Sequence, residues 1–327
     1  MLQYFLPRPT ALSSWIQPFT EYFSLSALPL HIHQVLLAFI AYHFINIIYS
    51  PFVSARLFPK HYSHFTVKSK FIWDLNVVRL FKSPIIVFLS LYAVTTYDGS
   101  ATTDWKERVW GYTASGGTAQ AVALAFFLWE IIIAVQHFEI LGWPMLLHSI
   151  SSSLGATLAF RPLFNYYFTR YLLVELITVF WILEPLFEKV DMGKSRAQLC
   201  NSVILLVSFF ICRILWGPYL LICFYRDVWA TINYSAFHHN IKSFNSTTFG
   251  ISDIENVSTI VPSHDDSDIM IFAGPEHVPV WIALTIASSV TIINILSFYW
   301  FGRILRSVRN RYDPQSITVK GTQDSCI

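Results

Sequence analysis

Charged residues are scarce in this chain of 327 residues: Asp, Glu, Lys and Arg make up 13% of it, against 54% hydrophobic residues. Soluble globular domains carry roughly 25% charged residues. Together with a mean hydropathy of +0.49, the shortage excludes an ordinary soluble domain and indicates that lipid surrounds much of the chain. The net charge of only +2, without a basic stripe interleaved with aromatic residues, excludes a nucleic-acid-binding protein.

Cysteine is also rare, and its spacing predicts neither a disulfide framework nor a zinc site, because no C-x-x-C pair occurs. The four cysteines are Cys200, Cys212, Cys223 and Cys326. His238-His239 and the acidic run 264–268 carry metal-friendly side chains, but both fall in a polar stretch where a solvated loop is expected. We therefore expect no metal and no cofactor. The first fifteen residues lack the pattern of a cleavable signal peptide, so the first apolar run is expected to act as an uncleaved signal anchor.

Long apolar runs dominate the rest of the sequence. Windows of about 19 residues predict seven membrane-spanning helices, near 30–51, 74–97, 119–139, 143–160, 163–184, 199–225 and 278–302. Pro84 is expected to kink the second, which either crosses in full or begins at the interface. A re-entrant hairpin is the alternative for the third and fourth. The fold class is therefore expected to be an all-α polytopic membrane protein.

Basic residues predict the orientation. Four Lys or Arg follow the first span, three follow the fifth and five follow the seventh, against Arg8 alone before the first. These segments share one side if all seven spans cross, and the positive-inside rule assigns that side to the cytosol. The N-terminus and a loop at 227–277 are then lumenal. Three acceptor sequons in that loop predict glycosylation, at Asn233, Asn245 and Asn256.

Ionisable residues inside the predicted spans are the most informative feature of the sequence. Glu130 lies in the third span, His148 in the fourth, Arg170 and Glu175 in the fifth, and Arg213 in the sixth. A charge in hydrocarbon costs about 2.5–3.5 kcal/mol on insertion scales. These side chains are therefore expected to face one another or a hydrated cavity inside the bundle.

Positions along the spans predict a cavity open to the cytosol, which allows two interpretations. In the first, the cavity takes a lipid headgroup or an acyl thioester, and the binding residues are Asp74, Arg79, Lys82, Arg170, Glu175 and Arg213. In the second, the buried charges only neutralise one another and lock the bundle, and the residues concerned are Glu130, Glu175, Arg170 and Arg213.

His148 is the candidate for catalysis, because an imidazole with an ordinary pKa near 6.5 acts as a general base at neutral pH. Glu130 and His137 are the candidates to assist it, since they lie seven residues apart on one helical face. The alternative is that His148 and the serines after it only let helices approach closely.

Four segments together resemble the TLC-domain family, which includes ceramide synthases and translocating-chain-associated membrane proteins. They are KSKFIWDLNVVRLFKS (68–83), LAFFLWEIII (124–133), GWPMLLHSISSSLGATL (142–158) and TRYLLVELITVFWILEPLF (169–187). The positions that match the family are Lys70, Trp73, Asp74, Glu130, His148, Glu175 and Leu176.

The resemblance implies a six-helix core of two related halves, one extra N-terminal helix, and residence in the endoplasmic reticulum. The expected organisation is a lumenal segment, a first helix with a basic cytosolic loop, the helical bundle containing the lumenal loop, and a cytosolic tail. Their bounds are 1–29, 30–65, 66–305 and 306–327.

Two departures argue against ceramide synthase activity. Ceramide synthases resemble one another in two adjacent histidines, where this chain has His148-Ser149, and Lys82 stands where a further histidine is common. The leading hypothesis is a protein of lipid homeostasis that binds membrane lipids or locally thins the bilayer. The alternative is an acyltransferase that uses acyl-CoA or phospholipid. A seven-span receptor is the third, disfavoured by the mid-membrane acidic residues and the lack of a receptor motif.

Overall fold

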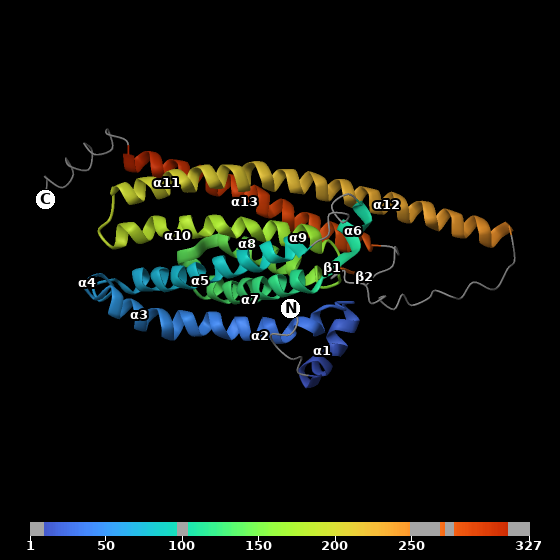
Figure 1. Ribbon diagram of the computed structural model, residues 1–327, viewed down its shortest axis with the longest axis horizontal. Helices are drawn as coiled ribbons and strands as arrows, with labels where there is room; N and C mark the ends of the chain where they lie inside the picture. Colours follow the sequence, from blue (N-terminus) through green and yellow to red (C-terminus); the bar gives the residue numbers. More distant parts are fainter. Residues whose placement is uncertain (1–9, 97–103, 249–268, 272–277, 313–327) are drawn as a thin grey trace.

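The computed structural model is an elongated bundle of long, nearly parallel helices, and it describes residues 10–96, 104–248, 269–271 and 278–312 (Figure 1). The bundle begins with α2 (Leu28–Phe44), which continues through a π-helical turn (Ile45–Tyr49) into α3 (Ser50–Leu57). The other long elements are α5 (Val67–Thr96), α7 (Ala114–Gln136), α8 (Phe138–Leu158), α10 (Leu176–Lys189), α11 (Arg196–Phe209), α12 (Gly217–Thr248) and α13 (Val280–Tyr312).

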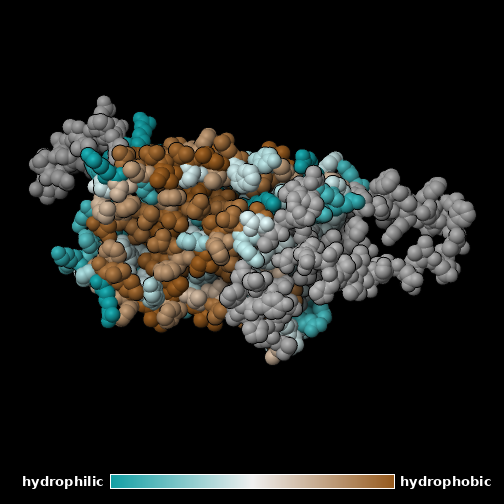
Figure 2. Space-filling view, viewed as in Figure 1, coloured by the Kyte–Doolittle hydropathy of each residue, from teal (hydrophilic) through white to brown (hydrophobic). Residues whose placement is uncertain are grey.

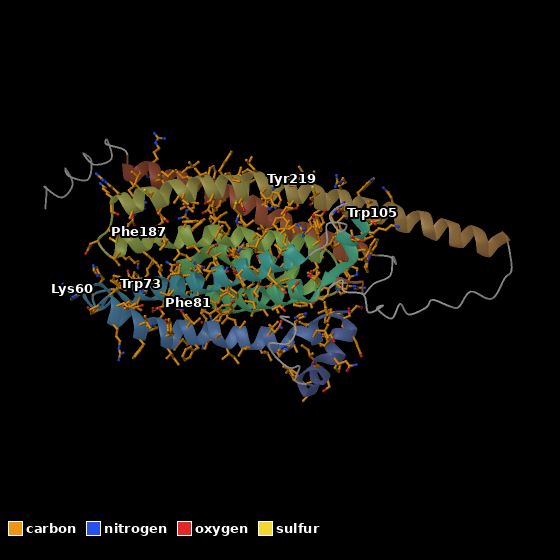
Figure 3. All side chains as sticks on the ribbon, in the orientation of Figure 1. Lys60, Trp73, Phe81, Trp105, Phe187 and Tyr219 are labelled. Carbon is orange, nitrogen blue, oxygen red and sulfur yellow. The ribbon has the colours of Figure 1, made fainter. Side chains whose placement is uncertain are left out.

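Shorter elements complete the fold. They are α1 (Thr10–Tyr22), α4 (Pro59–Tyr62), α6 (Trp105–Trp110), α9 (Asn165–Leu172), the 3-10 turn Leu173–Glu175, the π-helical segment Phe210–Trp216, and the strands β1 (Gly111–Thr113) and β2 (Ile269–Ile271). The two strands pair antiparallel. Lys60 marks one end of the bundle and Trp105 marks the other (Figure 3); we call these the α4 end and the α6 end.

The outer surface of the bundle is apolar, as a lipid-facing surface requires. Hydrophobic residues cover the length of one face, and hydrophilic residues gather toward its ends (Figure 2). Within the described ranges, five helical stretches are long and apolar enough to cross a membrane: 28–57, 67–95, 114–136, 196–233 and 280–311. The all-α, multi-pass fold class is thus confirmed. The predicted spans 143–160 and 163–184 are also helical but are not among the five, so the count of seven stays a prediction.

Several helices extend beyond the predicted spans, and α5 and α12 are two examples. Helix α5 begins at Val67 and runs without interruption through Pro84, so it starts seven residues before the predicted span at 74. Helix α12 extends to Thr248, so the first part of the predicted lumenal loop, 227–248, is helical. Polar side chains misled the prediction in both places, because window hydropathy follows side-chain polarity whereas helix ends are decided by backbone hydrogen bonding.

Small residues on α7 allow close packing at the centre of the bundle. Helix α7 contacts α2, α5 and α8, while α8 also packs on α13, and α10 packs on α5 and α11. Ala119, Ala121, Ala123 and Ala125 are fully buried. Their small side chains leave room for a buried aromatic cluster in which Tyr42 meets Phe126 edge-on, with ring centroids 5.5 Å apart. These helices surround the polar groups of the interior.

Buried polar contacts tie the elements together at both ends. At the α6 end, Arg108 donates to Asp227 through Nε (2.6 Å) and Nη2 (2.9 Å), and Tyr167 donates to the same carboxylate at 2.5 Å. The hydrogen bonds with Asp227 raise the pKa of the Arg108 guanidinium above its already high ordinary value.

At the α4 end, Ser50 and Tyr62 donate to Asp74 at 2.5 and 3.0 Å. Burial, and then the Asp74 charge, raise the pKa of Tyr62, so its hydroxyl remains a donor at neutral pH.

Candidate functional site

Helix α5 brings two cations into the middle of the bundle. Arg79 and Lys82 are three residues apart and therefore share one helical face. Arg79 donates to Glu130 Oε1 through Nε (3.2 Å) and Nη2 (2.8 Å). Lys82 Nζ lies 2.6 Å from Glu175 Oε2 and 4.0 Å from the ring centroid of Phe126. Each mid-bundle carboxylate therefore has a cation from α5 as its direct partner.

The direct partners of Glu130 and Glu175 are therefore Arg79 and Lys82, whereas the second interpretation paired these carboxylates with Arg170 and Arg213. Arg79 and Lys82 also lie deeper in the bundle than expected from their positions in the cytosolic third of the predicted span 74–97. The reason is the early start of α5: Lys82 lies fifteen residues after Val67 (82 − 67), near the middle of the helix that ends at Thr96. Two turns added before the predicted start move both cations inward, to the level of Glu130 and Glu175.

His148 and Ser149 on α8 complete this side of the interior. Ser149 donates to Glu130 Oε2 at 2.7 Å, so Glu130 has a partner on each oxygen. The His148 ring lies edge-on to Trp300 of α13, with centroids 5.3 Å apart. Its Nδ1 is buried and has no hydrogen-bond partner among the residues that the structure describes. The hydrogen-bonding capacity of this ring nitrogen is therefore not used by the described residues.

Arg213 enters the interior from the π-helical segment Phe210–Trp216, between α11 and α12. Its electrostatic partner is Glu175, but no carboxylate of the described chain lies within 4.0 Å of its guanidinium nitrogens. Glu175 is already engaged by Lys82 at 2.6 Å. Arg213 therefore differs from Arg79 and Lys82, each of which has a direct salt-bridge partner.

Two adjoining cavities meet at these groups. The first, of about 740 Å³, is mainly apolar and extends toward the α6 end, and we call it the apolar cavity. Its lining includes Phe127, Gly155, Leu172, Phe224 and Ile286. The second, of about 660 Å³, is the charged cavity, lined by Arg79, Lys82, Glu130, Met145, Trp181 and Trp300 among others. His148, Glu175 and Arg213 line both, so the two cavities share one charged boundary.

A third cavity, of about 1070 Å³, lies beside the charged cavity toward the α4 end. We call it the mouth cavity. It shares Met145, Trp181 and Trp300 with the charged cavity, and Glu184, Glu188 and Arg311 also line it. The interior is thus a series of three adjoining spaces. The first two, from the α4 end, carry charged residues in their linings, and the third, toward the α6 end, is mainly apolar.

Several predicted site residues lie away from these cavities. Asp74 is held by Ser50 and Tyr62 at the α4 end. His137 lies at the turn between α7 and α8 with its ring 4.0 Å from that of Phe71, and it lines none of the three cavities. It is therefore not placed to be the second imidazole beside His148. Arg170 donates to the Tyr166 carbonyl at 3.0 Å and covers the Tyr166 ring.

The sequons are only partly within the described structure. Asn233 is exposed on α12. Asn245 falls on the same helix at a position whose side chain is not described, and Asn256 lies outside the described residues. In the described ranges, no group of three or more His, Cys, Asp or Glu side chains is placed to hold a metal ion. The run 264–268 is outside those ranges.

Sequence reasoning missed the aromatic and flexible walls of the charged cavity. Met145, Trp181 and Trp300 come from three helices far apart in the chain, and nothing in their spacing distinguishes them from lipid-facing residues. It also missed Gly155, at which an added Cβ would meet no atom within 4 Å although the residue is buried in the bundle. That open space is part of the apolar cavity.

Comparison with known proteins places this site in a family. A TLC-domain family model matches residues 72–306, which includes every charged residue of the charged cavity. An uncharacterised TLC domain-containing protein of Schizosaccharomyces pombe is 32% identical over 213 residues, covering 65% of this chain and 71% of that protein. Topoisomerase I damage affected protein 4 of Saccharomyces cerevisiae is 24% identical over 61% of this chain and 71% of its own length. No solved structure matches this chain.

Proposed function

The chain belongs to the TLC-domain family, and on that premise we propose that its interior holds a membrane lipid as part of lipid homeostasis in the endoplasmic reticulum. The observation that carries the proposal is the shared boundary of the apolar and charged cavities at His148, Glu175 and Arg213. A lipid has the same division, because an acyl chain prefers apolar walls whereas its headgroup needs hydrogen-bond and charge partners.

The distribution of basic residues supports an orientation of the bundle in the membrane. Basic residues surround the α4 end, including Lys60 (Figure 3) and the α13 arginines Arg303, Arg306, Arg309 and Arg311. The positive-inside rule places such an end in the cytosol. The headgroup would then enter from the cytosolic side through the mouth cavity, with the acyl chain directed toward the lumen.

The shape of α8 supports a local effect on the bilayer. Gly142 interrupts the helix with φ +69°, so the uninterrupted part is 143–158, sixteen residues or about 24 Å at 1.5 Å per residue. The hydrocarbon core is about 30 Å thick. A helix this short favours a thinner membrane beside it, and we propose thinning as a consequence of the fold that accompanies lipid binding.

The test blocks the apolar cavity. At Gly155 an added Cβ meets no atom within 4 Å, so Gly155→Leu is expected to fold and, by extending into the apolar cavity, to exclude the acyl chain. Gly302→Leu is the matched control, because Gly302 is also a helical glycine with open space around it but does not line the cavities. Lipids retained by each purified protein are extracted and quantified by mass spectrometry.

We expect Gly155→Leu to retain at least tenfold less lipid than the wild-type protein and Gly302→Leu to match the wild type. Equal retention by all three proteins, with thermal unfolding showing each to be folded, would contradict the proposal. Helix propensity does not confound the comparison, since both substitutions replace glycine by leucine within a helix.

Acyl transfer is the second candidate function, favoured by the unpartnered Nδ1 of His148 at the boundary of the two cavities. His148 would take the proton of an acceptor hydroxyl or amine as that group attacks an acyl thioester. The C–S bond then breaks, a C–O or C–N bond forms, and the proton passes to the leaving thiolate. Transfer of labelled acyl chains from acyl-CoA to a membrane lipid extract, present in the wild type and absent in folded His148→Gln, is the expected result. No transfer by the wild-type protein would exclude this candidate.

A further inference from the structure

Resting on the proposed function, we infer that the lipid in these cavities carries an anionic headgroup, a carboxylate or a phosphodiester, which binds Arg213. The inference names the headgroup chemistry and the residue that selects it. It depends on three features of the interior: its charge, the position of Arg213, and the hydrogen-bonding groups around that position.

The charged cavity has an excess of positive charge. Its cations are Arg79, Lys82 and Arg213, and its carboxylates are Glu130 and Glu175. Glu130 and Glu175 are each held by a cation at 2.8 and 2.6 Å, a geometry that favours the ionised form of both. The balance is therefore 3 − 2 = +1 if His148 is neutral and +2 if it is protonated. Arg213, the cation without a direct salt-bridge partner, is half-buried, and one bound anionic headgroup lowers the excess charge of the cavity by one.

Arg213 is the cation with capacity to bind the headgroup. Lys82, which competes with Arg213 for Glu175, already contacts the Glu175 carboxylate at 2.6 Å. Guanidinium groups present parallel N–H donors that match the oxygens of carboxylates and phosphates. Because Arg213 lines both cavities, an anion bound there would leave its acyl chain directed into the apolar cavity.

Contacts with two other helices fix the backbone that carries Arg213 at this boundary. A π-helical turn is uncommon and is found frequently at functional sites, and Arg213 lies in the middle of one. Tyr171 of α9 donates to the Gly217 carbonyl at 3.0 Å, just after the π-helical segment. A Cβ on Gly217 would lie 2.8 Å from Asn294 Oδ1 of α13, so α13 packs closely against the same point. Two helices thus fix the segment that carries Arg213.

His148 supplies a second polar contact. His148 lines both cavities together with Arg213, and its buried Nδ1 has no hydrogen-bond partner among the described residues. When Nδ1 carries the proton, the imidazole donates to a second oxygen of the same headgroup. A neutral ester offers only weaker acceptors at this position, and a choline headgroup adds a cation to a cavity that already has a positive excess.

The test measures headgroup selectivity in the full-length protein in lipid nanodiscs. Four amphiphiles are compared: oleate and dioleoyl phosphatidylglycerol as anions, and methyl oleate and dioleoyl phosphatidylcholine as their uncharged and zwitterionic counterparts. Inorganic phosphate is added as a competitor in a separate arm. We expect each anion to bind at least tenfold more tightly than its counterpart, and phosphate alone not to compete, because it cannot use the apolar cavity.

Three variants assign the selectivity to Arg213. Arg213→Met is expected to weaken oleate and phosphatidylglycerol binding at least tenfold while leaving methyl oleate binding unchanged, and Arg213→Lys is expected to retain part of the preference. Arg306→Met is the matched control, because Arg306 is an exposed arginine of α13 outside the three cavities, and its binding profile should equal that of the wild type.

The outcomes separate this inference from the proposed function. Equal binding of anions and counterparts by the wild-type protein, lost in Gly155→Leu, would overturn the headgroup assignment and leave lipid binding intact. Competition by phosphate alone would identify a soluble anion rather than a lipid and overturn the assignment. Binding of none of the four amphiphiles would overturn both. The wild-type comparison decides the selectivity even if Arg213→Met does not fold.

Discussion

The ammonium group of Lys82 lies 2.6 Å from Glu175 Oε2, and both residues are almost wholly buried, at 2% and 6% exposure. The pair joins the middle of α5 to the turn that begins α10. Removing Lys82 leaves Glu175 without a direct ion-pair partner, because Arg213 interacts with it only from beyond 4.0 Å, and breaking a buried pair typically destabilises a protein by about 3–5 kcal/mol. We expect Lys82→Met to lower the unfolding temperature of the detergent-solubilised protein by several degrees, as measured by intrinsic fluorescence during heating.

The control for this prediction is the double variant Lys82→Met/Glu175→Gln. It removes both charges, and Gln keeps an acceptor for Thr178, whose hydroxyl donates to Glu175 at 3.0 Å. We expect it to regain most of the lost stability, because a buried pair replaced as a unit is often nearly neutral. A double variant as unstable as Lys82→Met would show that the lysine stabilises the bundle through its packing on Phe126 rather than through Glu175.

A second ion pair, between Arg108 and Asp227, fixes α6 to α12 at the other end of the bundle. Both guanidinium contacts are short, at 2.6 and 2.9 Å, and both side chains are buried. Arg108→Met is expected to destabilise the protein by about 3 kcal/mol, because Asp227 would retain only the hydrogen bond from Tyr167 as a buried contact. The measurement is thermal unfolding, together with amide exchange of the segment 105–110.

Arg226 provides a matched control for Arg108. It also approaches Asp227, at 3.8 Å, but its side chain is 69% exposed. Solvent screening reduces such a contact to less than about 1 kcal/mol, so Arg226→Met should unfold within a degree or two of the wild type. If the two arginine variants lose the same stability, burial does not determine the strength of the contact with Asp227.

The convergence of buried charges could be predicted from the sequence, whereas their partners could not. Glu130, His148, Glu175 and Arg213 all line the charged cavity, as charges inside apolar runs implied. The expected depth of Arg79, in the cytosolic third of the second span, is too shallow because α5 begins at Val67 and not near residue 74. Hydropathy alone does not distinguish a polar helix end inside a bundle from an interfacial segment, since both carry charged residues near the predicted membrane boundary.

The wrong expectation for His137 has a different origin. Helical periodicity places it on the face of Glu130, but α7 ends at Gln136 and His137 has left the helix, with φ −121° and ψ 40°. Helix α7 ends three residues before the predicted limit at 139, and the His137 ring lies 4.0 Å from that of Phe71. The π-helical geometry at Arg213 was equally beyond prediction, because a π turn depends on tertiary packing such as that of Asn294 against Gly217.

The last prediction concerns the mouth cavity. Arg311, near the end of α13, forms ion pairs with Glu184 and Glu188 of α10, and the Glu188 contact is 2.5 Å long. Asn201 of α11 also donates to Glu184, at 2.6 Å. Arg311 thus links α13 to α10 beside the mouth cavity. Its replacement is expected to loosen the end of α13 while the rest of the bundle stays folded.

Arg311→Gln should therefore increase amide exchange of the segment 305–312 about tenfold, which corresponds to the loss of roughly 1.4 kcal/mol, the lower end of the range for hydrogen bonds to charged groups. Exchange in α5 and α7 should stay unchanged. Arg309→Gln is the control, because Arg309 lies two residues away on the same helix and is exposed. Exchange of 305–312 that is equal in Arg311→Gln and the wild type would show that α13 is held by its apolar contacts, such as the buried Ile304, and that Arg311 does not restrain the mouth.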